Sequence, residues 1–166
     1  LAGFAVGVVE KEHIIDGTTI AAGDAVFGLA SSGLHSNGYS LARKIIATTP
    51  TDLAADFHGE PLGAVLMAPT RIYVKSILAL LAELPVKGLA HITGGGITEN
   101  LDRILPADCQ AEVLLGSWPI LPLCRVISEL GNIEREEMLR ATNMGIGMVI
   151  VVRPSNLNAL VATLKT

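Results

Sequence analysis

Apolar and polar residues follow two different spacings along this chain, and each spacing predicts one kind of element. Short runs rich in small and β-branched residues are typical of strands, whereas apolar residues that recur every three or four positions indicate helices. Five runs fit a strand: 4–9, 25–30, 88–93, 110–115 and 144–152. The last run is almost purely apolar, which indicates a strand covered on both faces.

Six helices are expected: one from Asn37 to before Pro50, one from Pro69 to before Pro85, and others over 97–105, 122–130, 134–140 and from 154 onward. Asn37 is available as an N-cap, Pro69 suits a first helical turn, and Gly131 suits a left-handed C-cap. Residues 51–61 show no periodicity, so we expect a surface connection there.

Strands and helices alternate irregularly, and the first two strands are expected to form a hairpin. This order predicts an α+β fold, with a mixed β-sheet flanked by helices. No internal repeat or linker is visible, so residues 1–166 are interpreted as one domain. Cys109 and Cys124 lack metal-ligand spacing and are expected to be reduced thiols, and no metal site is predicted.

The charge and hydropathy of the chain exclude several classes of partner. The net charge is -4 and the 12 basic residues are scattered, which argues against binding to nucleic acid. No apolar run is long enough to cross a membrane and no signal peptide is evident, so we expect a cytoplasmic protein without a membrane partner. Leu1 is not an initiator Met, which suggests a piece of a longer protein.

Two loops, each between an expected strand and an expected helix, carry the candidate chemistry. They are GLASSGLHSNG at 28–38 and HITGGGITEN at 91–100. The first nearly matches a phosphate-binding P-loop but has Leu34 and His35 in place of Lys and Ser or Thr, and neither loop fits GxGxxG. Free N–H groups at a helix N-terminus attract phosphate, so phosphate binding is one interpretation. Caps and turn-forming glycines are the other.

The histidines differ in how well they are placed for chemistry. His35 and His91 each stand beside one of the two loops, whereas His13 and His58 fall in an expected hairpin and an expected surface loop. A third glycine pattern, NMGIGM at 143–148, is interpreted as a bulge at the start of the last strand rather than as a ligand site.

Five segments together resemble the C-terminal half of the aminoimidazole ribonucleotide synthetase family, also called phosphoribosylformylglycinamidine cyclo-ligases. They are, in order, VVEKEHIIDG, GLASSGLHSNGYSLARKI, PTRIYVK, AHITGGGITENLDRILP and TNMGIGMVIVV, and the resemblance runs from about Val6 to Val152. It implies the fold of that family's C-terminal domain and an enzyme of purine biosynthesis. In that family ATP activates the formyl amide oxygen of formylglycinamidine ribonucleotide, and the neighbouring nitrogen closes the imidazole ring to give aminoimidazole ribonucleotide, ADP and phosphate.

The resemblance also implies partners outside this chain. The family's N-terminal domain carries the main ATP and Mg²⁺ ligands and the principal dimer interface, and no stretch here matches it. We therefore expect residues 1–166 to be the C-terminal half of a two-domain, homodimeric enzyme and to be inactive alone. The motif matches imply His35 and His91 as catalytic hydrogen-bond donors. They imply the following residues as ligands of the ribonucleotide or a phosphate: Ser32, Gly33, Ser36, Asn37, Thr93, Gly94, Gly95 and Gly96.

Two alternative functions stay open at the level of sequence. Sibling ATP-using enzymes, above all the formylglycinamidine ribonucleotide synthetases, share a similar SSGLHSNG loop, although its combination with HITGGGITENL and NMGIGMV favours the cyclo-ligases. The second alternative is a noncatalytic phosphate- or ribonucleotide-binding module, which would bind its ligand without an ATP-binding domain. A structural scaffold whose loops bind nothing stays open as well.

Overall fold

The most apolar stretch of the chain forms the central strand β5 (Ile146–Val152) in the computed structural model, which describes residues 3–164. Strands β1 (Ala25–Ala30) and β4 (Gly88–His91) pair with β5 on either side, in the order β1-β5-β4. Both pairings are antiparallel, so β1 and β4 run in the same direction and end at the same edge of the sheet. All of β5 except Met148 is buried, as its composition predicts.

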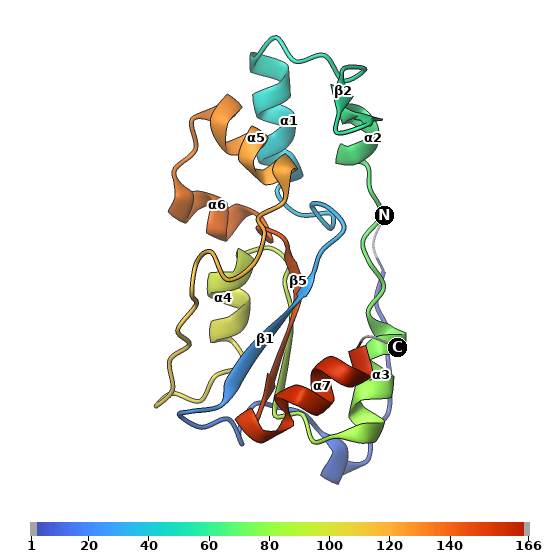
Figure 1. Ribbon diagram of the computed structural model, residues 1–166, viewed down its shortest axis with the longest axis vertical. Helices are drawn as coiled ribbons and strands as arrows, with labels where there is room; N and C mark the ends of the chain where they lie inside the picture. Colours follow the sequence, from blue (N-terminus) through green and yellow to red (C-terminus); the bar gives the residue numbers. More distant parts are fainter. Residues whose placement is uncertain (1–2, 165–166) are drawn as a thin grey trace.

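Helices cover both faces of this sheet (Figure 1). Helices α3 (Val74–Glu83) and α7 (Leu157–Leu164) pack on one face around Ile150, and α4 (Gly96–Asp102) covers the other around Val149. Successive residues of a strand point to opposite faces, so two adjacent residues of β5 belong to two separate cores.

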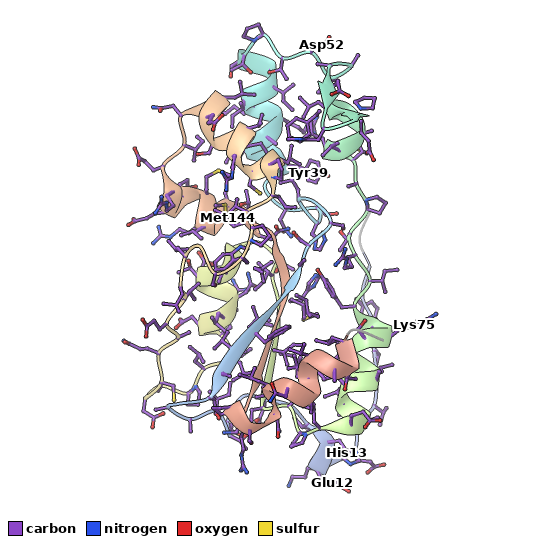
Figure 2. The ribbon with its side chains drawn as sticks, viewed as in Figure 1. Glu12, His13, Tyr39, Asp52, Lys75 and Met144 are labelled. Atoms are coloured by element: carbon purple, nitrogen blue, oxygen red, sulfur yellow. The ribbon has the colours of Figure 1, made fainter. Side chains whose placement is uncertain are left out.

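A second, helical region lies beyond the edge where β1 and β4 end (Figure 1). Its elements are α1 (Tyr39–Thr48), β2 (Asp56–Phe57), β3 (Glu60–Pro61), α2 (Leu62–Leu66), α5 (Pro122–Gly131) and α6 (Arg135–Ala141). Tyr39 and Met144 lie at its junction with the sheet (Figure 2). The fully buried Cys124 belongs to its core, in agreement with the predicted reduced thiol. Two short 3-10 helices, η1 (Lys11–His13) and η2 (Pro154–Asn156), lie in the remaining chain.

The predicted α+β class, with helices flanking a sheet, is confirmed. Pairing within the described sheets is antiparallel throughout, so the expected mixture of parallel and antiparallel strands is not found there. Residues 51–61 lie largely at the surface, as predicted, although they also contain β2 and β3. Within residues 3–164, every helix is too short or too polar to cross a membrane.

The strand and hairpin predicted at 4–9 are wrong. The segment is not part of any described strand, and Phe4, Val6 and Val8 are 92%, 82% and 100% exposed. A strand needs a partner for its backbone groups and a surface for its apolar face. Residues 3–164 provide neither for this segment.

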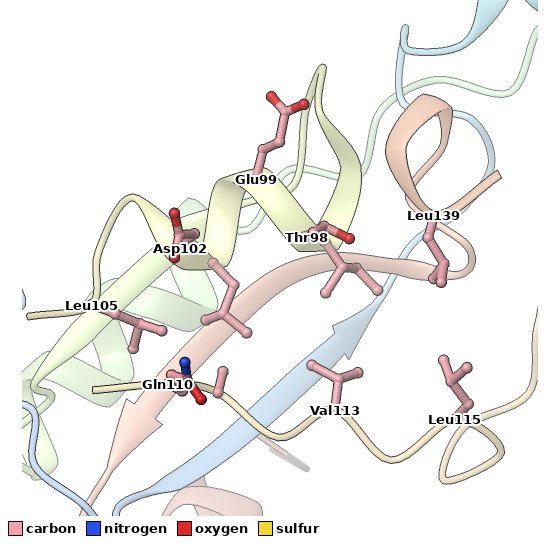
Figure 3. A pocket seen from close by; sticks show the side chains of 11 residues that line it. Thr98, Glu99, Asp102, Leu105, Gln110, Val113, Leu115 and Leu139 are labelled. Carbon is pink, nitrogen blue, oxygen red and sulfur yellow. The ribbon is translucent and has the colours of Figure 1, made fainter. Parts of the chain in front are cut away.

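The strand predicted at 110–115 is also wrong. The segment is irregular and runs beside α4, where Val113 and Leu115 line a hollow of about 570 Å³ between the two (Figure 3). Its apolar side chains are used for packing against the helix, while Leu114 stays 63% exposed. Tertiary packing has overridden the strand propensity of the sequence.

Several helix ends differ from prediction. Helix α1 begins at Tyr39 with Gly38 as its N-cap, because the Asn37 side chain donates instead to the backbone carbonyl of His35. The helix predicted from Pro69 begins only at α3, and residues 69–73 form a segment without regular secondary structure that we call the strap.

The last turn of α5 shows a further difference. Helix α5 includes Gly131, and Asn132 takes the left-handed C-cap with a φ of 47°. Asparagine tolerates this conformation better than most residues, so it replaces the predicted glycine cap.

Candidate functional site

The two loops singled out in the sequence meet at one edge of the sheet. The first loop (residues 31–38) follows β1, and the glycine loop (residues 92–96) follows β4. Because β1 and β4 flank β5, one strand separates the two loops, which corresponds to about 10 Å. The structure therefore brings the two predicted parts of the site together.

Both loops are hydrogen-bonded to the beginning of β5. Ser31 donates its backbone N–H to the carbonyl of Gly145 at 2.9 Å, and Ile92 donates its own to the carbonyl of Gly147 at 2.9 Å. Gly147 has no partner in the β1 ladder and forms a β-bulge. Bulges redirect side chains and are frequent near binding sites. The interpretation of NMGIGM as a bulge is confirmed.

His35 is buried inside the first loop. Its side chain Nε2 accepts backbone N–H groups of Ser32 at 2.9 Å and of Arg71 at 3.3 Å, which requires a neutral ring with the proton on Nδ1. Nδ1 is itself buried without a hydrogen-bond partner. Burial lowers the pKa of His35, and the positive charges of His91 and Arg71 lower it further. The ring therefore orients the loop, and its predicted catalytic role stays a prediction.

A row of three rings connects the two loops. The ring centroids of His35 and Tyr73 lie 6.0 Å apart, and those of Tyr73 and His91 lie 6.4 Å apart. The bulge makes room for this row, because a Cβ on Gly147 would overlap the Tyr73 hydroxyl and lie 2.6 Å from Cε1 of His35. His91 is the exposed member of the row.

Side chains of the strap and of the first loop hold the strap in place. The Ser32 hydroxyl donates to the carbonyl of Pro69 at 2.8 Å. The Tyr73 hydroxyl and Nη1 of Arg71 both donate to the carbonyl of Ala30, at 2.8 Å and 3.1 Å. These bonds hold the strap against the end of β1 and the first loop, and no helix begins at Pro69. Sequence analysis did not identify Arg71 or Tyr73 as site residues.

A buried asparagine holds the first loop against β5. Asn143 is 1% exposed, and its Oδ1 accepts the Ser31 hydroxyl at 3.0 Å and the Gly145 N–H at 2.9 Å. Its Nδ2 donates to the carbonyl of Gly33 at 2.7 Å. Sequence reasoning missed this residue, because two of its partners, Ser31 and Gly33, lie more than a hundred positions earlier in the chain.

A second asparagine holds the glycine loop. Nδ2 of Asn100 donates to the carbonyls of Thr93, Gly94 and Gly96, and its Oδ1 accepts the Thr93 hydroxyl. Here the sequence did contain a signal. Asn100 lies three positions after Ile97, on the buried face of a helix, where a polar residue needs hydrogen-bond partners.

The three consecutive glycines differ in backbone conformation and in surroundings. Gly95 is the left-handed N-cap of α4, with a φ of 95°. Gly96 has a φ of 60°, and a Cβ there would overlap the carbonyl oxygen of Leu139 in α6. The fold therefore explains two of the glycines by itself. Gly94 is exposed and has open space around it, so its backbone is accessible to a ligand.

The predicted site residues divide by exposure. Those open to solvent are Ser32, Ser36, His91 and Gly94; those partly covered are Asn37, Thr93 and Gly95; those buried are Gly33, His35 and Gly96. Among residues 3–164, no three His, Cys, Asp or Glu side chains are grouped to hold a metal ion.

The structure defines an α+β domain whose candidate site consists of loops that follow two strands of one antiparallel sheet. The chain belongs to the family described as AIR synthase related protein, C-terminal domain. The model of that family matches residues 21–166 of the chain.

Individual relatives agree with this family. A phosphoribosylformylglycinamidine cyclo-ligase of Burkholderia ambifaria is 57% identical over 164 residues, which cover 99% of this chain and 47% of the relative. The enzyme of the same name from Methylobacillus flagellatus is 57% identical over 165 residues, which cover 99% of this chain and 48% of the relative. The chain thus spans about half the length of the curated relatives it matches.

Proposed function

We propose that this chain is the substrate-binding C-terminal part of a phosphoribosylformylglycinamidine cyclo-ligase. The observation that carries the proposal is the 57% identity to such enzymes over 99% of the chain. The convergence of the first loop and the glycine loop at one edge of the sheet supports it, because a shared ligand can contact both.

The proposed reaction closes the imidazole ring of formylglycinamidine ribonucleotide at the expense of ATP. A new C–N bond forms at the formyl carbon while the C–O bond breaks, and the oxygen leaves as part of phosphate. Residues of the site would position the reacting groups and stabilise developing negative charge. The exposed Gly94 backbone and the His91 ring are suited to this role, whereas the Ser32 hydroxyl already donates to Pro69 and His35 orients the first loop.

The complete enzyme requires partners beyond this chain. We propose that ATP and Mg²⁺ are bound mainly by an N-terminal domain that precedes this one in the full-length protein, and that the full-length protein is a cytoplasmic homodimer. The substrate cleft would then lie between the two domains, with the exposed parts of the two loops on one of its walls.

Turnover by the full-length protein tests the proposed function. We expect release of ADP that depends on formylglycinamidine ribonucleotide and matches the formation of an aromatic amine product. His91→Ala should lower kcat by at least about tenfold, because it removes a hydrogen-bond donor from the transition state.

The matched control is His13→Gln, an exposed residue of η1, which should keep normal turnover. Absence of wild-type turnover, or turnover only of the substrate of a sibling enzyme, would overturn the proposal.

A further inference from the structure

A pocket of about 400 Å³ lies beside the row of rings, between the strap, α3 and the end of β4. Most of its lining is apolar, and its two basic groups are Arg71 and His91. The complete lining is Arg71, Ile72, Tyr73, Val74, Ile77, Leu78, His91 and Met148, without an acidic residue. The PTRIYVK segment, which the sequence analysis singled out, supplies one wall.

The guanidinium of Arg71 is held in place but keeps most of its donors. Nη1 donates to the carbonyl of Ala30, and the backbone N–H of the same residue donates to His35. A guanidinium has five N–H donors, so this single side-chain hydrogen bond orients its plane and leaves the other donors available.

The positive charge of Arg71 is not neutralised within residues 3–164. The two ion pairs of the described chain, Lys87 with Asp24 and Arg103 with Glu99, both lie elsewhere. The His91 ring stands beside the same pocket and next to the glycine loop. Both side chains line this one pocket, so a ligand that enters it can contact both.

We propose that Arg71 and His91 bind a phosphate group of the ligand. A guanidinium matches the oxygens of phosphate with two parallel hydrogen bonds, and apolar walls reduce the screening of charge by water. The inference rests on the proposed function, which involves two ligands that carry phosphate, the ribonucleotide and ATP. The shared chemistry is the phosphate group, and binding experiments decide which ligand supplies it.

The test uses the full-length protein and the variants Arg71→Gln, Arg71→Lys and His91→Ala. Binding of formylglycinamidine ribonucleotide, of the corresponding riboside without phosphate, and of ATP is measured by calorimetry. We expect Arg71→Gln to weaken binding of one phosphate-bearing ligand by at least about tenfold, since a bidentate charged contact is lost, and His91→Ala to weaken binding of the same ligand. Binding of the riboside should not change, and Arg71→Lys should give an intermediate loss.

The ligand whose binding is weakened in the variants identifies the source of the phosphate. Weakened ribonucleotide binding assigns the site to the ribonucleotide, and weakened ATP binding assigns it to ATP. Arg125→Gln, an exposed residue of α5, is the control and should bind all ligands normally. Circular dichroism checks that each variant is folded. Equal loss of ribonucleotide and riboside binding, or a change below about twofold for both phosphate-bearing ligands, would overturn the inference.

A separate probe distinguishes this inference from the proposed function. Inorganic phosphate is titrated into the wild-type protein and into Arg71→Gln, whether or not the protein turns over the ribonucleotide. Binding that Arg71→Gln weakens supports the anion site even if the reaction proves to be a different one. Equal binding to both proteins counts against the site even if ring closure is observed.

Discussion

A single buried side chain joins the first loop to the beginning of β5. Asn143 satisfies hydrogen-bonding groups of three other residues, and its own polar atoms are buried with them. Buried groups that lose their partners cost more than the hydrogen bond itself contributes. The shape of the first loop therefore depends on a residue outside the loop.

Replacing this asparagine should destabilise the chain. We expect Asn143→Ala to lower the free energy of unfolding by about 2 to 4 kcal/mol, because it leaves the Gly33 carbonyl and the Ser31 hydroxyl without partners. Urea denaturation followed by circular dichroism measures the change. Asn158→Ala, at an exposed position of α7, serves as the control. A loss for Asn143→Ala no larger than that of the control would contradict the assigned role.

The buried histidine predicts a dependence of stability on pH. His35 stays neutral in the folded chain, with its pKa lowered below the usual 6.5 by burial and by the charges of His91 and Arg71. The unfolded chain takes up a proton near pH 6.5, so this stabilisation is complete above that pH and is lost as the pH falls toward the lower folded pKa.

The comparison is between the wild-type chain and His35→Gln. Between about pH 7.5 and pH 5.5 the wild-type chain should lose more free energy of unfolding than the variant. Denaturation at a series of pH values measures the difference, and His13→Gln should behave as the wild type. Parallel pH profiles for wild type and His35→Gln would show that His35 does not titrate in this way.

At the scale of elements, the glycine loop shows how helix packing and ligand access are divided among neighbouring residues. Helix α4 approaches α6 so closely that Gly96 has no room for a side chain. Gly94, two positions earlier, contributes nothing to this packing. The two residues therefore form a natural pair for mutation.

Gly96→Ala should lower the free energy of unfolding by about 3 kcal/mol or more, because it adds a clash with Leu139 to an unfavourable positive φ. Gly94→Ala should change it by less than about 0.5 kcal/mol. Thermal and urea denaturation measure both.

The same Gly94→Ala change in the full-length enzyme tests access of the ligand to the backbone. Under the proposed function its methyl group should reduce turnover while the fold stays intact. Normal turnover would remove Gly94 from the site, and equal stability of the two alanine variants would refute the division of roles.

At the scale of the whole molecule, large apolar side chains stay exposed in the N-terminal segment (residues 4–9) and in α3. The N-terminal segment and α3 lie on the same side in Figure 1, and Lys75, at the start of α3, also projects outward there (Figure 2). The large apolar side chains that stay exposed in residues 4–9 and in α3 are Phe4, Val6, Val8, Val9, Val74, Leu78 and Leu81. Exposed apolar side chains in such numbers promote association in water.

We therefore expect the isolated 166-residue chain to self-associate as its concentration rises. Replacing Phe4, Val6 and Val8 together with serine should reduce the association, because these side chains are at least 82% exposed and support no core. Sedimentation velocity at several concentrations measures it. The control replaces the neighbouring exposed Lys11 and Glu12 with serine. A wild-type chain that stays monomeric throughout the series would contradict this expectation.

Local sequence carries enough information for most elements of this fold. The apolar run of β5 and the helical spacing of α1, α3, α5 and α6 are local patterns, and the structure confirms them. The segments 4–9 and 110–115 have an equally strand-like composition but no strand partner within residues 3–164. The strand prediction fails at both segments for one reason. A strand forms only beside a partner strand, and that partner is often distant in sequence.

The sequence by itself determined the α+β class, the family and the two loops of the candidate site, because composition, spacing and motifs are properties of contiguous residues. The tertiary structure decided which residues of those loops are open to solvent. It buried His35, assigned Gly96 to helix packing, and brought Arg71 beside His91. These outcomes depend on contacts between residues far apart along the chain, and such contacts exist only once the sheet has brought its strands and loops together.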